Sequence, residues 1–151
     1  MAPPQLLGTY DPTEQDLIFN GVQITGFAEG SFIKAMRNEP GWSFKPSNSG
    51  GGARCRNPNK SGRFEFTLHQ GSPSNGVLSA FAALDEATAE GVGEVMVKDR
   101  STGPSGAKAT AQNGWVVQHA DLQRSKETDD ITWIIETEEI LIAHAGLTPV
   151  T

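Results

Sequence analysis

The chain has 151 residues, which is enough for one domain with a sizeable core. Its formal net charge of −6 argues against a sequence-independent grip on nucleic acid, because such a grip needs clustered Lys and Arg. The sequence contains one cysteine, Cys55, which excludes an internal disulfide, and it has no apolar run long enough for a transmembrane helix. The 17 glycines and 9 prolines predict many turns and hence a mainly β chain.

The first predicted elements are an arm and a hairpin. Residues 1–14 are predicted to form an extended N-terminal arm, because Pro3-Pro4 and Pro12 oppose both helix and ladder pairing. Residues 16–25 predict a hairpin, since Asn20-Gly21 separates two apolar runs and suits a type I′ turn. A further strand is predicted over residues 31–37.

Residues 38–62 form a long segment rich in glycine, proline and asparagine. They carry four basic side chains: Lys45, Arg54, Arg56 and Lys60. A structureless loop of this length is unusual inside a compact domain. We therefore expect either a twisted hairpin, with residues 42–45 against 53–56, or a segment that orders against a partner, with a mobile surface loop as the plainer alternative.

The next segment combines one clear strand with one helix. Residues 63–69 alternate between apolar and polar side chains, which predicts a strand with one dry face and one wet face. Ser72-Pro73 is typical of a helix start, and an apolar stripe of Val77, Leu78, Phe81 and Leu84 predicts a helix over residues 73–89.

The C-terminal part is again strand-rich. Strands are predicted at residues 94–100, 107–119 and 131–142, with a turn at 101–106, and Trp115 and Trp133 are expected to be core anchors. We therefore predict one domain over residues 15–146, followed by a tail at 147–151. Its fold class is mainly β with one α-helix, arranged as two packed antiparallel sheets or as a half-barrel flanked by the helix.

No pattern in the sequence supports catalysis, so we expect neither an enzyme nor a metal or cofactor site. His69, His119 and His144 are scattered, and Cys55 has no cysteine partner. Gly91-Val92-Gly93 lacks the third glycine of a dinucleotide fingerprint. Glu136 and Glu138 are expected to share a strand face, which could make a weak cation site but is more typical of a solvated edge.

Several short strings, taken together in order, carry a resemblance. They are Tyr10-Asp11-Pro12, Phe19-Asn20-Gly21-Val22, residues 24–30, Arg37-Asn38-Glu39, Ser61-Gly62 with the strand to Leu68, residues 70–75, and Leu78-Ser79-Ala80. Over about residues 10–84 this sequence resembles the tail tube family of contractile-tailed phages, whose members are related in fold to the type VI secretion tube. It departs from the family between Pro40 and Asn59, where Trp42, Pro46 and Gly50-Gly51-Gly52 replace an expected hairpin.

The resemblance implies a structural virion protein that forms the inner tail tube. Hexameric rings would close a continuous β-barrel and stack into a conduit for DNA ejection. The implied partners are further copies of the chain, the tail sheath, the tape-measure protein, the baseplate and tail terminator proteins, and genomic DNA that passes without specific binding. The implied location is the virion tail, assembled in the host cytoplasm, with no membrane anchor. Residues 1–7 lack the basic region and apolar stretch of a secretory signal peptide, so none is expected.

Two sets of residues are candidates for these roles. The basic residues Lys45, Arg54, Arg56 and Lys60 are candidate ring-to-ring contacts, facing acidic groups such as Asp129 and Asp130. The wet face of the strand at 63–69 predicts a lumen lined by Arg63, Glu65 and Thr67, with Glu136 and Glu138 adding acidity that repels phosphate.

Two alternatives stay open at this point. One is another virion β-sandwich, such as a capsid decoration or head–tail joining protein. The other is a carbohydrate-binding β-sandwich that uses Trp42, Trp115 and Trp133 as stacking platforms.

Overall fold

The structure is a computed structural model that describes residues 8–30, 32–102 and 106–146, together with Leu6. Most of the predicted arm at residues 1–14 and the whole predicted tail at 147–151 lie outside the described residues. Of the arm, Pro12–Glu14 forms a short 3-10 helix that starts after Asp11, whose carboxylate accepts hydrogen bonds from the backbone N–H and the hydroxyl of Thr13.

The chain is mainly β with one α-helix, as predicted. In the described residues, ten strands and the helix follow in the order β1 (Gln15–Phe19), β2 (Val22–Ile24), β3 (Ile33–Arg37), β4 (Trp42–Pro46), β5 (Gly52–Arg56), β6 (Gly62–His69), α1 (Ser74–Thr88), β7 (Gly93–Asp99), β8 (Lys108–Val116), β9 (Asp130–Thr137) and β10 (Leu141–Ala143). A second 3-10 helix, Arg100–Thr102, follows β7.

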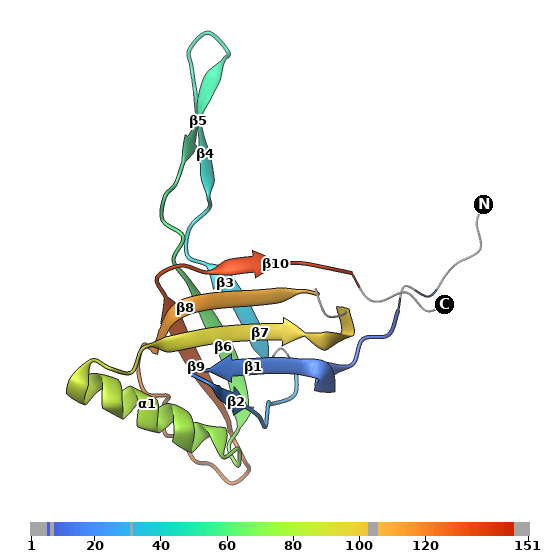
Figure 1. The fold of residues 1–151 in the computed structure, drawn as a ribbon, viewed down its shortest axis with the longest axis vertical. Helices are drawn as coiled ribbons and strands as arrows, with labels where there is room; N and C mark the ends of the chain where they lie inside the picture. The colour runs from blue at the N-terminus through green and yellow to red at the C-terminus, as the bar shows by residue number, and fades with distance from the viewer. Residues whose placement is uncertain (1–5, 7, 31, 103–105, 147–151) are drawn as a thin grey trace.

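Two antiparallel sheets are present, and they differ greatly in size. The large sheet has the order β2-β1-β7-β8-β9-β6-β3, with β10 paired to β8, and the small one is the β4–β5 hairpin. The large sheet bends so that β3, β6 and β9 cross behind β1, β7 and β8, while the hairpin projects away from both layers (Figure 1). The prediction of two packed sheets therefore corresponds to two layers of one bent sheet. In the described part of the chain this sheet is open, because its strand path ends at β2 and β3.

The core lies between the two layers. The alternation in β6 is confirmed, since Phe64, Phe66 and Leu68 are buried and face Ile135 and Trp133 of β9 from the same layer. Leu17, Phe19 and Val95 come from the other layer and belong to the same apolar cluster. Antiparallel strands with one dry face each are what the period-two patterns predict.

The Asn20-Gly21 hairpin is confirmed. Phe19 pairs with Val22, and Asn20 and Gly21 have φ of 50° and 80°, the left-handed values that a type I′ turn requires. Helix α1 lies across one end of the layers (Figure 1). It buries Leu78 and Ala82, and Phe81 packs edge-on against Phe19 with ring centroids 5.1 Å apart. The predicted apolar stripe is wrong at its end, since Leu84 is 43% exposed.

The predicted strand at residues 131–142 is wrong in its length. The chain leaves β9 after Thr137, and the short β10 returns to pair with the other end of β8. Between them Ile140 is fully buried and its N–H donates to the carbonyl of Lys60. A Cβ at Gly62 would lie 2.3 Å from Ile140 Cγ2, so only glycine lets this side chain enter the core. Burial of one isoleucine therefore breaks the strand.

Replacing Phe66 with alanine is expected to lower the free energy of unfolding by about 3–5 kcal/mol, because the ring is 1% exposed and its removal leaves a cavity. Urea denaturation at a concentration where the protein is monomeric measures this loss. The matched control is Thr67→Ala on the neighbouring wet position, where a loss below about 1 kcal/mol is expected. Equal losses for the two variants would contradict the burial pattern of β6.

Candidate assembly surfaces

The wet face of the layer β3-β6-β9 is a mixed-charge surface. Register places Arg63 opposite Glu136, Glu65 opposite Ile134, and Thr67 opposite Thr132, so these side chains share the face away from the core. Arg63 Nε lies 3.5 Å from Glu65 Oε1, and the two threonine hydroxyls lie 3.2 Å apart. Four of the five residues predicted for the lumen, namely Arg63, Glu65, Thr67 and Glu136, therefore lie together.

Glu138, the fifth predicted residue, lies elsewhere. The expectation that it shares a strand face with Glu136 is wrong, because β9 ends at Thr137. Glu138 is exposed, its N–H donates to the carbonyl of Asn113, and it lines a hollow with Glu94 and Glu139. The chain turns here to bring Ile140 into the core, which removes Glu138 from the row.

The segment at residues 38–62 folds back as a hairpin, which confirms one of the two expected arrangements. The sequence departure between Pro40 and Asn59 therefore does not remove the hairpin. Trp42 pairs with Arg56 and Phe44 with Arg54, so these four side chains share one face. The guanidinium carbon of Arg54 lies 4.1 Å from the centroid of the Trp42 ring, and that of Arg56 lies 5.9 Å away. This cation–π stacking holds two positive charges in a fixed place on a projecting arm.

The other basic candidates lie apart from this face. Lys45 pairs with Ala53, and this pair alternates with the Phe44–Arg54 pair, which places Lys45 on the opposite face of the hairpin with Cys55. Lys60 lies beyond the hairpin, with its Nζ 3.9 Å from Glu139 Oε1.

A carboxylate fixes the hairpin base. Glu39 Oε2 accepts hydrogen bonds from Asn57 Nδ2 at 2.8 Å and from Asn59 Nδ2 at 3.2 Å. The hydrogen bond from Asn57, and to a smaller extent the one from Asn59, holds the pKa of the Glu39 carboxyl below its usual value. Further along the hairpin, residues 42–56 contain no acidic residue.

The predicted acidic partners lie at the opposite end of the layer. Asp130 pairs with His69 at one end of the β6–β9 ladder, and Thr137 pairs with Gly62 at the other end, from which the chain continues to the hairpin. The eight residues of β6 span about 25 Å between these two ends. Asp129 is bound locally, because its N–H donates to Gln70 Oε1 and its Oδ1 accepts from Ser125. Basic and acidic candidates thus lie at opposite ends of one subunit.

The same layer has two free strand edges, which the sequence did not indicate. Within the described residues β3 pairs with β6 alone, which leaves its other edge bare. On the other side of the layer the last strand is the end of β8. Its pairing with β7 stops at Gly114, whereas Trp115 and Val116 remain paired with β9, so among the described residues their outer edge has no neighbouring strand. Val117 prolongs this edge, since its N–H donates to the carbonyl of Ile134.

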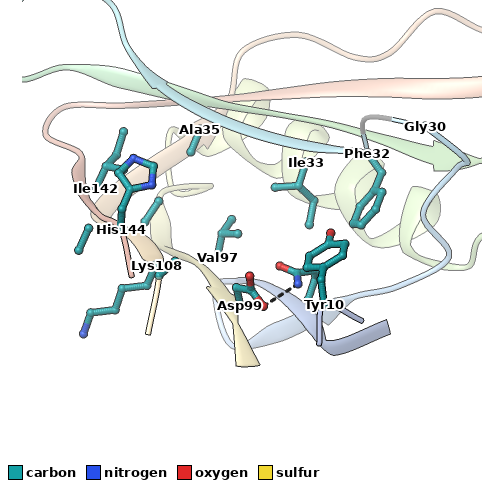
Figure 2. A pocket seen from close by; sticks show the side chains of 14 residues that line it. Tyr10, Gly30, Phe32, Ile33, Ala35, Val97, Asp99, Lys108, Ile142 and His144 are labelled. Carbon is teal, nitrogen blue, oxygen red and sulfur yellow. Dashed lines mark hydrogen bonds between the residues drawn. The ribbon is translucent and has the colours of Figure 1, made fainter. Parts of the chain in front are cut away.

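A groove of about 430 Å³ opens between the layers beside the β3 edge. Ile33 and Ala35 of β3 form one wall, and Val97, Ala109 and Ile142 form the other. Figure 2 shows Tyr10 and Phe32 facing each other at one end, with His144 and Lys108 at the other. At the floor Gln15 Nε2 donates to Asp99 Oδ1 at 2.7 Å, which leaves the walls largely apolar.

The three tryptophans do not form a common platform. Trp133 is buried, and its Nε1 donates to Asn75 Oδ1, so its predicted core position is confirmed. Trp115 is half-buried and points to the wet face opposite Glu136, so its predicted core position is wrong. Trp42 lies on the hairpin beneath Arg54.

Among the described residues no group of three or more His, Cys, Asp or Glu is placed to hold a metal ion. None of the described helices has the length and apolar character to cross a membrane.

Comparison with known proteins identifies fold relatives only by structure. No protein-family model matches the chain, and no curated protein matches it by sequence. A chain of the anti-feeding prophage cap, the AFP tube terminating cap, superposes with a TM-score of 0.65 at 7% identity, covering 95% of this chain and 97% of that one.

Two further structures come from an extracellular contractile injection system named PVC. A chain of its sheath/tube terminator in the extended state has a TM-score of 0.61 at 6% identity, covering 89% of this chain and 96% of that one. A chain of its sheath-tube complex has a TM-score of 0.60 at 6% identity, covering 91% and 93%. The chain therefore has a fold that occurs in the tube cap, tube terminator and sheath-tube complex of contractile injection systems, which confirms the sequence resemblance to contractile tail tubes at the level of the fold.

Proposed function

We propose that this protein is a structural, non-enzymatic subunit of a contractile tail, and that it forms the inner tube as stacked hexameric rings. One observation carries the proposal. The whole described domain, and not a part of it, shares its fold with chains of tube-bearing assemblies, with 95% of this chain and 97% of the relative covered in the first comparison.

Ring closure would use the two free edges of the layer β3-β6-β9-β8. Successive antiparallel pairings make β8 antiparallel to β3. A rotation about the ring axis keeps strand direction along that axis, so residues 115–119 of one subunit would meet β3 of the next in an antiparallel pair. Each copy thereby covers an edge that would otherwise be an aggregation site. The contact is heterologous and closes by rotation.

Ring stacking would use the hairpin and the opposite end of the subunit. Arg54 and Arg56 sit on a projecting arm, whereas Asp129 and Asp130 lie about 25 Å away at the other end of β6 and β9. Head-to-tail stacking would bring the hairpin end of one subunit against the Asp129–Asp130 end of a subunit in the next ring. Lys45, on the opposite face of the hairpin, and Lys60, beyond its base, are further candidates at the same end of the subunit. A contact of this kind does not close, and it therefore produces a filament.

The wet face bearing Arg63, Glu65, Thr67 and Glu136 would line the channel. Such a lumen would first hold the tape-measure protein and then pass genomic DNA without specific binding. The outer layer would dock the sheath, and the tube ends would meet baseplate and terminator proteins. The assembly would form in the host cytoplasm and reside in the virion tail.

A tube terminator is the second candidate, because the matched structures include a tube terminating cap and a sheath/tube terminator. Sedimentation velocity over a concentration series separates the two roles. Species that keep growing with concentration support an inner tube, and a single ring-sized species supports a terminator. A monomer at every concentration, with and without a tail partner, would contradict both.

A further inference from the structure

Leu122 has the most exposed large apolar side chain in the described part of the chain, at 82%. It follows the free edge at Trp115 and Val116, and Val117 on the same edge is also exposed. Residues 118–124 belong to no helix or strand in the subunit. A leucine that follows an unpaired edge is positioned to be covered by a neighbouring subunit, and the fold has a groove beside the other edge.

Side-chain direction along this edge favours insertion between layers. Val116 is buried, and Ala120 packs against the core, whereas Trp115 and Val117 point to the wet face or to solvent. Residues 118–124 belong to no strand in the free subunit. Once they pair with a neighbouring edge and extend the strand, an even-numbered residue would face the interlayer side, since side chains alternate along a strand. Leu122 is such a residue.

The groove on the neighbouring subunit lies at the matching place. In the antiparallel arrangement inferred above, residues after 119 run past the N-terminal end of β3, which begins at Ile33. Gly30, Phe32 and Tyr10 lie there, and they line both the interlayer groove and an adjoining hollow of about 480 Å³. Figure 2 shows the Tyr10 and Phe32 rings facing each other at this end.

Charge supports the same pairing. Strand β3 carries Lys34 and Arg37 and no acidic residue, whereas residues 115–123 carry Asp121 and neither Lys nor Arg. Two edges of opposite charge attract, and two copies of either edge repel. A second copy of this chain, joined edge to edge, is therefore the occupant that fits.

We propose that Leu122 of one subunit inserts between the layers of the next, at the end of the groove formed by Tyr10, Gly30 and Phe32, and so fixes the register of the ring. This inference rests on the proposed ring. Burial of one leucine side chain is sufficient to shift an assembly equilibrium by at least about tenfold.

Thiol crosslinking tests the contact directly. In a Cys55→Ser background, Tyr10→Cys and Leu122→Cys are combined, and assembled protein is treated with a short bismaleimide. We expect a covalent ladder from dimer to hexamer. The matched control combines Tyr10→Cys with Leu84→Cys, an exposed leucine on α1, and should give no ladder.

A second comparison measures the contribution of the side chain. Leu122→Asp should raise the protein concentration for half-maximal ring formation at least about tenfold, whereas Leu84→Asp should leave it within about twofold. Neither side chain is buried in the free subunit, so both variants should fold.

The outcomes separate this inference from the proposed function. Three results would overturn the Leu122 contact and leave the proposed ring intact. They are rings that give no crosslinked ladder, a ladder of equal strength in the Leu84 control, and unchanged assembly of the Leu122→Asp variant. Failure of the unmodified protein to form rings would overturn both.

Discussion

Replacing Arg54 and Arg56 with glutamate is expected to leave subunits folded and rings intact but to abolish tube elongation. Both guanidinium groups stack near Trp42 on a hairpin whose strand residues are all exposed, so the substitutions remove no core contact. They replace two cations by two anions at the surface proposed to meet Asp129 and Asp130 of the next ring. Like charges at close range then oppose stacking.

Electron microscopy of the variant measures the effect as tube length. Arg54→Lys with Arg56→Lys is the matched control, because it keeps both charges and should restore elongation at least in part. Deleting residues 50–52 should also block elongation, since Gly50 and Gly51 form the turn hydrogen bonds with Ser47 and Gly52 pairs with Pro46, so the tip of the hairpin would be lost. Tubes of ordinary length from the double glutamate variant would show that the hairpin is not the stacking surface.

In the proposed tube, converting Glu65 and Thr67 to lysine is expected to leave assembly nearly intact and to slow or stall DNA ejection. Both side chains lie on the wet face of β6, and in a ring each substitution is repeated in every subunit. Added cations along a channel would bind phosphates, which the native mixture of charges does not favour. The defect should ease as salt concentration rises, because salt screens the attraction and reduces counterion release.

The double lysine variant also introduces a local charge repulsion. Glu65 lies 3.5 Å from Arg63 and pairs with Lys34, so a lysine at position 65 adds repulsion between three cations. Thr67→Lys alone avoids this and should show a smaller defect of the same kind, whereas Thr67→Gln should show none. Ejection rates are compared in fully assembled phage particles at low and high salt. Unchanged ejection by the double lysine variant at low salt would place the channel on another face.

Local chemistry made part of the fold predictable. Asn20-Gly21 specifies its turn because both residues adopt positive φ, and β6 specifies its burial because its alternation has no error. Ile140 could not be predicted, since the break between β9 and β10 depends on a space above Gly62 that exists only in the folded core. The pattern of apolar and polar residues alone predicts that β9 continues through Ile140.

Trp115 shows how one extra residue misleads a period-two argument. On β7, Gly93 and Val95 are two residues apart, but their partners Gly114 and Ala111 on β8 are three apart. This bulge leaves Gln112 and Asn113 both exposed and reverses the direction of every later side chain. Trp115 is therefore placed on the wet face, where strict alternation from Ala109 and Ala111 predicts the core.

The candidate surfaces also divide into those that the sequence predicts and those that only the folded structure reveals. The basic hairpin and the wet row of β6 follow from residue type and spacing. The two free edges and the groove between layers depend on which strands meet, and in particular on β8 leaving β7 at Gly114. Leu122 is notable only once its exposure is known.

Negative-stain electron microscopy of the purified, unmodified protein tests the central claim most directly. The account predicts closed rings with a central channel at moderate concentration, and stacks of these rings as concentration rises. Dispersed single subunits under all conditions, or aggregates without a channel, would contradict it.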